Sequence, residues 1–106
     1  MRMSSSDVNA VITVLTSYVN EIAELRLFGS RVNDKARGGD IDLLLIVSLP
    51  DLRDQLMYYK AKILSEIKAV IGDQKIDLYV ISQNEINTDA FIKSVMPESI
   101  ILYRWT

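Results

Sequence analysis

Apolar residues recur along much of the chain at the three- and four-residue spacing that is typical of amphipathic helices. The first such stretch follows the serines and the aspartate of residues 4–7, which are candidates for a helix N-cap. Its apolar stripe consists of Val8, Val11, Ile12, Leu15, Val19 and Ile22. A second stretch opens at Pro50 and Asp51, has Gly72 as its C-cap, and predicts one long helix. The side expected to be buried comprises Leu52, Leu56, Tyr59, Ile63, Ile67, Val70 and Ile71.

Other segments have the pattern of β-strands, with turn-forming residues between them. Residues 24–28 alternate between polar and apolar side chains and end at a glycine, and residues 75–81 form a similar strand. Residues 40–47 are polar at the start and apolar afterwards, which predicts a strand that is covered on both faces. Between 30 and 39 the apolar pattern stops, which predicts a loop with room for one helical turn.

The C-terminal quarter is predicted to contain a short helix and an apolar tail. The helix covers residues 88–95 and is ended by Pro97, which cannot continue it. The tail, residues 100–103, is expected either to pack on the sheet or to form an edge strand.

The order of these elements predicts an α/β (α+β) fold in which helices pack on a short mixed sheet. The 106 residues fit one domain, 1–106, and neither a linker nor an internal repeat divides them. No apolar run reaches the length of a membrane span, and the N-terminus lacks the apolar segment of a signal peptide. A cytoplasmic protein with no membrane partner is therefore expected.

The composition narrows the available chemistry. The chain has neither cysteine nor histidine, which excludes disulfides, zinc–thiolate sites and histidine-based catalysis. Catalysis must then depend on carboxylates, hydroxyls, lysine, arginine and backbone groups, an inventory that suits oxygen-bound Mg²⁺. The net charge of −2 argues against a nucleic-acid partner, because phosphate contacts usually require a basic surface. The apolar content is sufficient for a homodimer or a heterocomplex.

Two carboxylates, Asp40 and Asp42, stand two residues apart at the start of the second predicted strand. Residues with this spacing point to the same face of a strand, with Cα atoms roughly 6–7 Å apart. Placing two negative charges side by side is costly unless a cation lies between them. Phosphoryl-transfer sites of the two-metal type hold ions about 3.5–4 Å apart in this way. The pair therefore predicts a divalent-cation site.

A glycine and a serine, Gly29 and Ser30, stand where the first predicted strand ends and the chain turns. A glycine lets the backbone approach a phosphate closely, and the following amides and the hydroxyl can donate to its oxygens. Arg31 adds a guanidinium that suits phosphate, and Lys35 and Arg37 are further candidates for phosphate contact.

A third acid, Asp77, lies on the third predicted strand between two apolar residues. If this strand lies beside the second one, Asp77 can face Asp40 and Asp42. There it could complete the metal site or accept the proton of an attacking hydroxyl.

Taken singly, each of these features also has a structural explanation, because glycine turns, exposed Asp-x-Asp pairs and solvated arginines are common. Their order is more specific: Phe-Gly-Ser-Arg at 28–31, Gly-Asp-Ile-Asp-Leu at 39–43, and Asp77 on a later strand. This pattern resembles the nucleotidyltransferase superfamily of DNA polymerase beta. More narrowly, it is similar to the minimal nucleotidyltransferases (MNT) of prokaryotes, which include the antitoxins of HEPN/MNT toxin–antitoxin pairs. The similarity extends over essentially the whole chain.

The resemblance implies a polymerase-beta-like fold and specific roles for these residues. Gly29 and Ser30 would hold the triphosphate of ATP, with Arg31 beside them. Asp40 and Asp42 would bind two Mg²⁺ ions, with Mn²⁺ as the alternative, and Asp77 would be the third carboxylate. By analogy with the antitoxins, the acceptor would be a tyrosine hydroxyl of a HEPN-domain toxin, which AMP would silence.

Two alternatives remain open at this point. The same chemistry could modify a small molecule, such as an aminoglycoside, or the 3′ end of a tRNA. The chain could instead be a non-catalytic subunit that masks a toxin by contact alone.

Overall fold

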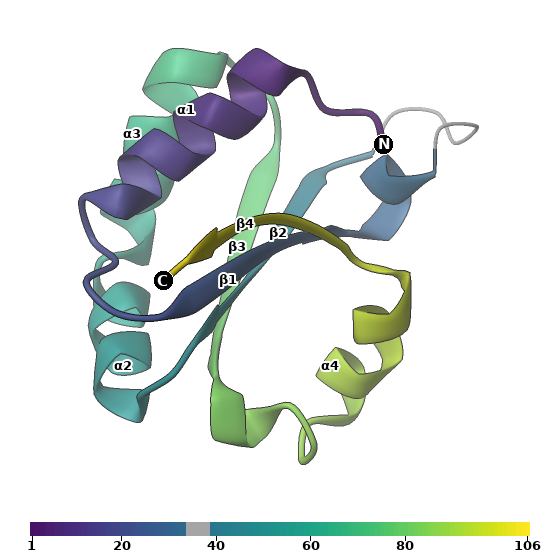
Figure 1. Ribbon diagram of the computed structural model, residues 1–106. Coiled ribbons are helices and arrows are strands. Elements are labelled where there is room, and N and C mark those ends of the chain that lie inside the picture. Colours follow the sequence, from purple (N-terminus) through teal and green to yellow (C-terminus); the bar gives the residue numbers. More distant parts are fainter. Residues whose placement is uncertain (34–38) are drawn as a thin grey trace.

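A computed structural model of the chain describes residues 1–33 and 39–106 and confirms the predicted fold class, a mixed sheet packed with helices (Figure 1). In chain order the elements are α1 (Ser5–Thr16), β1 (Ala23–Phe28), η1 (Gly29–Val32), β2 (Ile41–Val47), α2 (Pro50–Tyr58), α3 (Lys60–Ile71), β3 (Ile76–Ser82), η2 (Gln83–Glu85), α4 (Ala90–Val95), η3 (Met96–Glu98) and β4 (Ile100–Trp105). The three η elements are short 3₁₀ helices. Among the described helices, none has the length and apolar character needed to cross a bilayer.

The four strands form one sheet in the order β3-β2-β1-β4. β1 runs antiparallel to both β2 and β4, whereas β2 and β3 are parallel. The sheet is therefore mixed, as predicted. The apolar tail forms an edge strand, which extends to Trp105.

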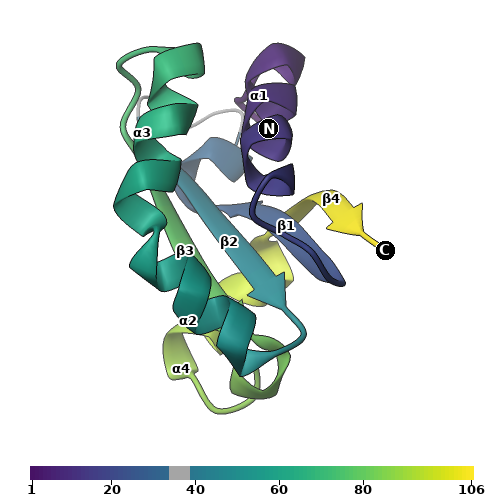
Figure 2. The ribbon, with the colours of Figure 1, turned by 90° about the vertical axis from the view of Figure 1, so that its left-hand side faces the viewer.

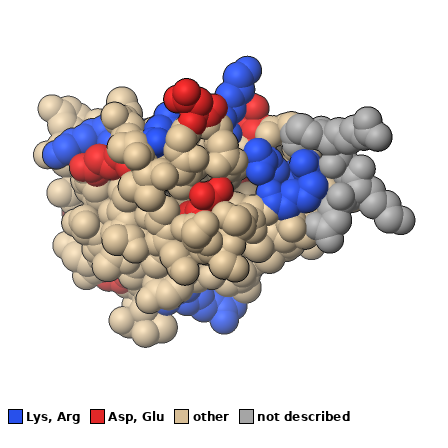
Figure 3. Space-filling model, turned by 90° about the horizontal axis from the view of Figure 1, so that it is seen from above, with Lys and Arg blue, Asp and Glu red and all other residues tan. Residues whose placement is uncertain are grey.

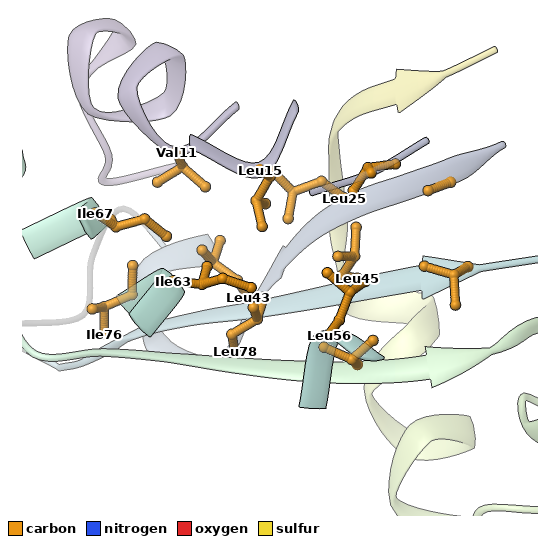
Figure 4. Packing of buried hydrophobic residues seen from close by; sticks show 14 of the residues in the cluster. Val11, Leu15, Leu25, Leu43, Leu45, Leu56, Ile63, Ile67, Ile76 and Leu78 are labelled. Atoms are coloured by element: carbon orange, nitrogen blue, oxygen red, sulfur yellow. The ribbon is translucent and has the colours of Figure 1, made fainter. Parts of the chain in front are cut away.

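The two faces of the sheet are covered by different helices. Figures 1 and 2 show α1, α2 and α3 on one face and α4 on the other. On the first face, alternate residues of the strands pack against these helices and form the main core, which Figure 4 shows from close by. Its labelled members are Val11, Leu15, Leu25, Leu43, Leu45, Leu56, Ile63, Ile67, Ile76 and Leu78. On the second face, Ile92 of α4 packs with Leu44 and Ile46 of β2, so β2 is buried on both sides as its apolar run predicted.

The first helix is shorter than its apolar stripe predicted, and it ends at Thr16. The amides of Ser17, Tyr18 and Val19 bond to carbonyls of the last helical turn and close the helix. Val19 is still buried, but it reaches the core from the connection to β1, and Ile22 is 67% exposed. The spacing was correct for packing at Val19 and wrong for Ile22, because the chain must turn before β1 begins.

The predicted long helix is in fact two helices, α2 and α3, which meet at Tyr59. Tyr59 has φ −92° and ψ 6°, outside the helical range, and it is 37% exposed. Val70, also expected to be buried, is 66% exposed. The break lets α3 lie against α1 while α2 lies against β2 and β3, as Figure 2 shows. Tertiary packing thus overrides a periodicity that continues through the break.

The remaining helix signals agree with the structure to within two residues. Gly72 is the C-cap of α3, with φ +87°. The predicted helix at 88–95 begins at Ala90, because the carboxylate of Asp89 accepts a hydrogen bond from the amide of Ile92 and caps it. Pro97 follows α4 within η3.

Candidate active site

The structure brings the three predicted carboxylates to one part of the sheet. β2 and β3 are parallel neighbours, and Asp42 is the register partner of Asp77. Both side chains lie on the face that carries α4, because their neighbours Ile41, Leu43 and Leu78 are buried on the opposite face. Asp40 is exposed and immediately precedes β2. The predicted adjacency of the second and third strands is therefore confirmed.

Asp42 is the central member of this group, and its environment disfavours its charge. Burial raises the pKa of the Asp42 carboxyl above its usual range, and the neighbouring charges of Asp40 and Asp77 raise it further. A carboxylate that is half-buried beside two others is stabilised by a cation. Its oxygen atoms are the ligands that Mg²⁺ and Mn²⁺ prefer, so the donor set fits a divalent ion.

The group is not preassembled around a cation. Within residues 1–33 and 39–106, no set of three acidic side chains has the arrangement of a ready-made metal site. Asp77 is engaged elsewhere: its Oδ1 accepts hydrogen bonds from Lys60 Nζ at 2.9 Å and from the Leu78 amide at 2.8 Å. Although burial raises the pKa of Asp77, these donors and the charge of Lys60 lower it more, so the net pKa lies below its ordinary value.

The pattern along the chain gave no reason to select Lys60. It is the first residue of α3 and was placed inside the predicted long helix. Because the helix breaks at Tyr59, α3 begins beside β3, where Lys60 Nζ reaches Asp77 and lies 5.5 Å from the centre of the Tyr79 ring. The helical spacing of apolar residues continues through Tyr59 and carries no information on the break, so only the structure reveals this contact.

Gly29 lies directly against the carboxylate of Asp42. Its predecessor Phe28 is the register partner of Asp42 across β1 and β2, and the chain turns into η1 at this point. Gly29 has φ +78°, and a Cβ atom on it would lie 2.7 Å from Asp42 Oδ2. The turn thus requires glycine for its backbone conformation and for the space that it leaves to the acid.

Ser30 packs against the far end of the same loop. A Cβ atom on Gly39 would collide with Ser30 Oγ and would lie 2.9 Å from Ser30 Cβ. The two ends of the loop therefore meet, and Gly39 is the residue before Asp40. The serine predicted to hold phosphate and the acids predicted to hold cations consequently lie close together.

The guanidinium of Arg31 has protein partners on three sides. It donates to the carbonyl of Gly39 at 3.2 Å, to the carbonyl of Arg2 at 2.8 Å, and to Gln74 Oε1 at 3.4 Å. Arg2 in turn donates to the carbonyls of Ser30 and Asn33. Arg31 thus fastens the turn to the N-terminus, and its contact with a nucleotide stays a prediction. Figure 3 shows basic and acidic side chains together on the upper face of the molecule, and the other candidates for phosphate contact, Lys35 and Arg37, lie outside the described residues.

A cavity of about 320 Å³ opens beside Asp42 and Gly29. Three aromatic rings contribute to its wall, from Phe28 of β1, Tyr79 of β3 and Phe91 of α4. Tyr79 could have been selected from the sequence, because it stands two residues after Asp77 on a strand and so shares its face. Phe91 gave no such signal, since its position depends on how α4 packs.

Comparison with known families agrees with this geometry. The family model described as "Polymerase beta, Nucleotidyltransferase" matches residues 9–105. The chain therefore belongs to the polymerase beta nucleotidyltransferase family, as the motif predicted. Members of this family use, in general, a nucleoside triphosphate and a divalent metal. Among curated proteins, no match to the chain is found.

Proposed function

We propose that this protein transfers AMP from ATP to a hydroxyl group of a partner protein, a tyrosine of a HEPN-type toxin, and so acts as an antitoxin. The observation that carries the proposal is the register pairing of Asp42 with Asp77, together with Gly29, which follows β1 and lies against the Asp42 carboxylate. The family membership supports nucleotidyl transfer in general. The similarity to the minimal antitoxin members and the net charge of −2 favour a protein acceptor over a polynucleotide.

In the proposed reaction the acceptor oxygen forms a bond to the α-phosphorus of ATP, and the bond from this phosphorus to the bridging oxygen of pyrophosphate breaks. Gly29 and Ser30 hold the leaving triphosphate end, and Asp40 and Asp42 would hold two Mg²⁺ ions, with Asp77 as a further ligand. When bound, such ions neutralise charge on the phosphate oxygens and orient them. Lys60 keeps Asp77 ionised, in the form that can accept the proton of the attacking hydroxyl.

Label transfer tests this proposal. The purified chain is incubated with Mg²⁺ and α-labelled ATP in an extract of its own host, beside Asp42→Asn and a control, Asp73→Asn. Asp73 is an exposed acid in the turn between α3 and β3, so its variant has the same charge change away from the site. We expect one discrete labelled protein with wild type and Asp73→Asn and none with Asp42→Asn. Undiminished labelling by a folded Asp42→Asn variant would refute the site assignment.

A second candidate function is supported by the ion pair between Lys60 and Asp77. With Asp77 held by a lysine and no three acids preassembled in the described chain, a subunit that masks a toxin by contact alone also fits. Two results would support this reading: the protein inhibits a toxin at equal stoichiometry without ATP, and the Asp42→Asn variant inhibits it equally well. Inhibition that requires ATP and an intact Asp42 would support the enzyme.

A further inference from the structure

Three aromatic side chains from separate elements converge beside the proposed reaction centre. Ring centres lie 5.5 Å apart for Phe28 and Tyr79, 5.9 Å for Phe28 and Phe91, and 5.7 Å for Tyr79 and Phe91. Phe28 is 5% exposed and forms the floor, whereas Tyr79 and Phe91 are 36% and 48% exposed and stand at the opening. Two partly exposed rings that face one cavity offer planar apolar surfaces to a ligand.

The composition of the wall restricts what the cavity can hold. Besides the rings, the cavity is lined by Gly29, Asp42, Val95 and Glu98. No lysine or arginine of the described chain lines it, so the space between the rings offers phosphate groups no positively charged partner. A triphosphate or a nucleic-acid backbone is therefore a poor occupant of the space between the three rings. A flat uncharged ring is a good one, because aromatic side chains stack on any base and need no specific hydrogen bond.

The geometry of the proposed reaction indicates whether this ring belongs to the nucleoside or to the acceptor. In phosphoryl transfer the attacking and leaving oxygens lie roughly in line on opposite sides of phosphorus. With the triphosphate end at Gly29 and the acceptor at Asp77, this line runs from the end of β1 past Asp42 to β3. The oxygen that leads to the nucleoside is then roughly perpendicular to this line, so the nucleoside extends to one side of it.

The cavity borders this line beside Gly29 and Asp42, the residues assigned to the triphosphate and to the metal ions. Tyr79, two residues beyond Asp77 along β3, also contributes to its wall, whereas neither Asp77 nor Ser30 does. An acceptor ring inside it would approach phosphorus from the side and not from the Asp77 end. We infer that the cavity between Phe28, Tyr79 and Phe91 holds the base of the nucleoside triphosphate by ring stacking. This inference rests on the proposed nucleotidyl transfer at Asp42.

Calorimetric titration in Mg²⁺ buffer, without an acceptor, tests the inference with two ligands: ATP, and inorganic tripolyphosphate, which lacks a base. Phe91→Ala removes one ring, and Phe91→Tyr keeps it. Because Phe91 is about half exposed, neither change removes a core side chain. We expect Phe91→Ala to weaken ATP binding roughly tenfold, within the range measured for loss of a stacking ring, and to leave tripolyphosphate binding unchanged. Phe91→Tyr should bind both ligands like wild type.

Three results would overturn the inference. The first is unchanged ATP affinity in Phe91→Ala, confirmed by an equally unchanged Tyr79→Leu. The second is an equal loss for both ligands, which would indicate a phosphate site or a distorted fold. The third is a Phe91→Ala variant that binds ATP like wild type but labels the acceptor protein slowly, which would assign the cavity to the acceptor.

Failure of the underlying function has a different signature. If wild type binds neither ligand, the proposed transfer and the base site both fall. If instead Asp42→Asn binds ATP like wild type in Mg²⁺ while Phe91→Ala does not, the base site stands and the metal assignment falls.

Discussion

Replacing Gly29 with alanine should displace the carboxylate of Asp42. The added Cβ atom would lie 2.7 Å from Asp42 Oδ2, whereas ordinary van der Waals contact begins at 3.4 Å. The acid must therefore move by about 0.7 Å, the difference between these two distances. A displacement on the order of 1 Å in a reaction site can cost roughly a hundredfold in rate. We expect nucleotidyl transfer by Gly29→Ala to fall by about this factor.

The same substitution also strains the backbone, and Gly72 provides a matched control for this effect. Gly72 has φ +87°, similar to the +78° of Gly29, but a Cβ atom on it would meet nothing within 4 Å. Each alanine variant should lose roughly 1–3 kcal/mol of stability, because side chains rarely adopt such φ values. In a domain of this size each kcal/mol lowers the melting temperature by about 4–8 °C.

Thermal unfolding by circular dichroism and transfer of labelled AMP, measured on both variants well below their melting temperatures, separate the two effects. We expect comparable losses of stability and a loss of transfer only in Gly29→Ala. Equal transfer rates in folded Gly29→Ala and Gly72→Ala would refute the idea that the turn fixes the position of Asp42.

Four further predictions concern the acids, Lys60 and the core. In EDTA at neutral pH, Asp42→Asn should unfold at a higher urea concentration than wild type, because the raised pKa of Asp42 means that its ionised form destabilises the fold. Urea titrations at several pH values should show this gain in stability vanish below about pH 4, where the wild-type acid is protonated in both the folded and the unfolded state. Asp77→Asn should be less stable at neutral pH, and its deficit should disappear as acid protonates Asp77, because the pKa of Asp77 is lowered. Lys60→Met should bind Mn²⁺ more tightly by up to about fivefold, measured by electron paramagnetic resonance, since Asp77 loses a competing cation. Leu43→Ala, at a fully buried core position, should cost about 2–5 kcal/mol in urea unfolding.

The strands and the acids could be predicted because their signals are local. Alternation along 24–28 and 75–81 and the apolar run after Asp42 fix which face each residue takes, and β1, β2 and β3 lie within one residue of these ranges. The pairing of Asp42 with Asp77 required one further assumption, that the second and third strands are neighbours. A helical crossover between parallel strands makes this a natural arrangement.

The positions of the helices depended on contacts that a periodicity does not contain. The stripe from Leu52 to Ile71 has the same spacing on both sides of Tyr59, yet α2 packs on the sheet and α3 packs on α1. For this reason Lys60 was missed, although it is the ion-pair partner of a predicted catalytic acid. Phe91 was missed for the same reason, because the packing of α4 decides which of its side chains face the cavity.

The parallel register of β2 and β3 also limits how the length of this chain can change. Val80 packs in the main core and Asp77 lies on the opposite face, three positions earlier on β3. Losing one residue between them, for example Leu78, would force a choice: either Asp77 stays beside Asp42 and Val80 leaves the core, or Val80 stays and Asp77 turns into it. A residue lost from the turn at 72–75 imposes no such choice. The strands that carry the acids can therefore exchange residues but not gain or lose them, and insertions and deletions should be tolerated only in the connections.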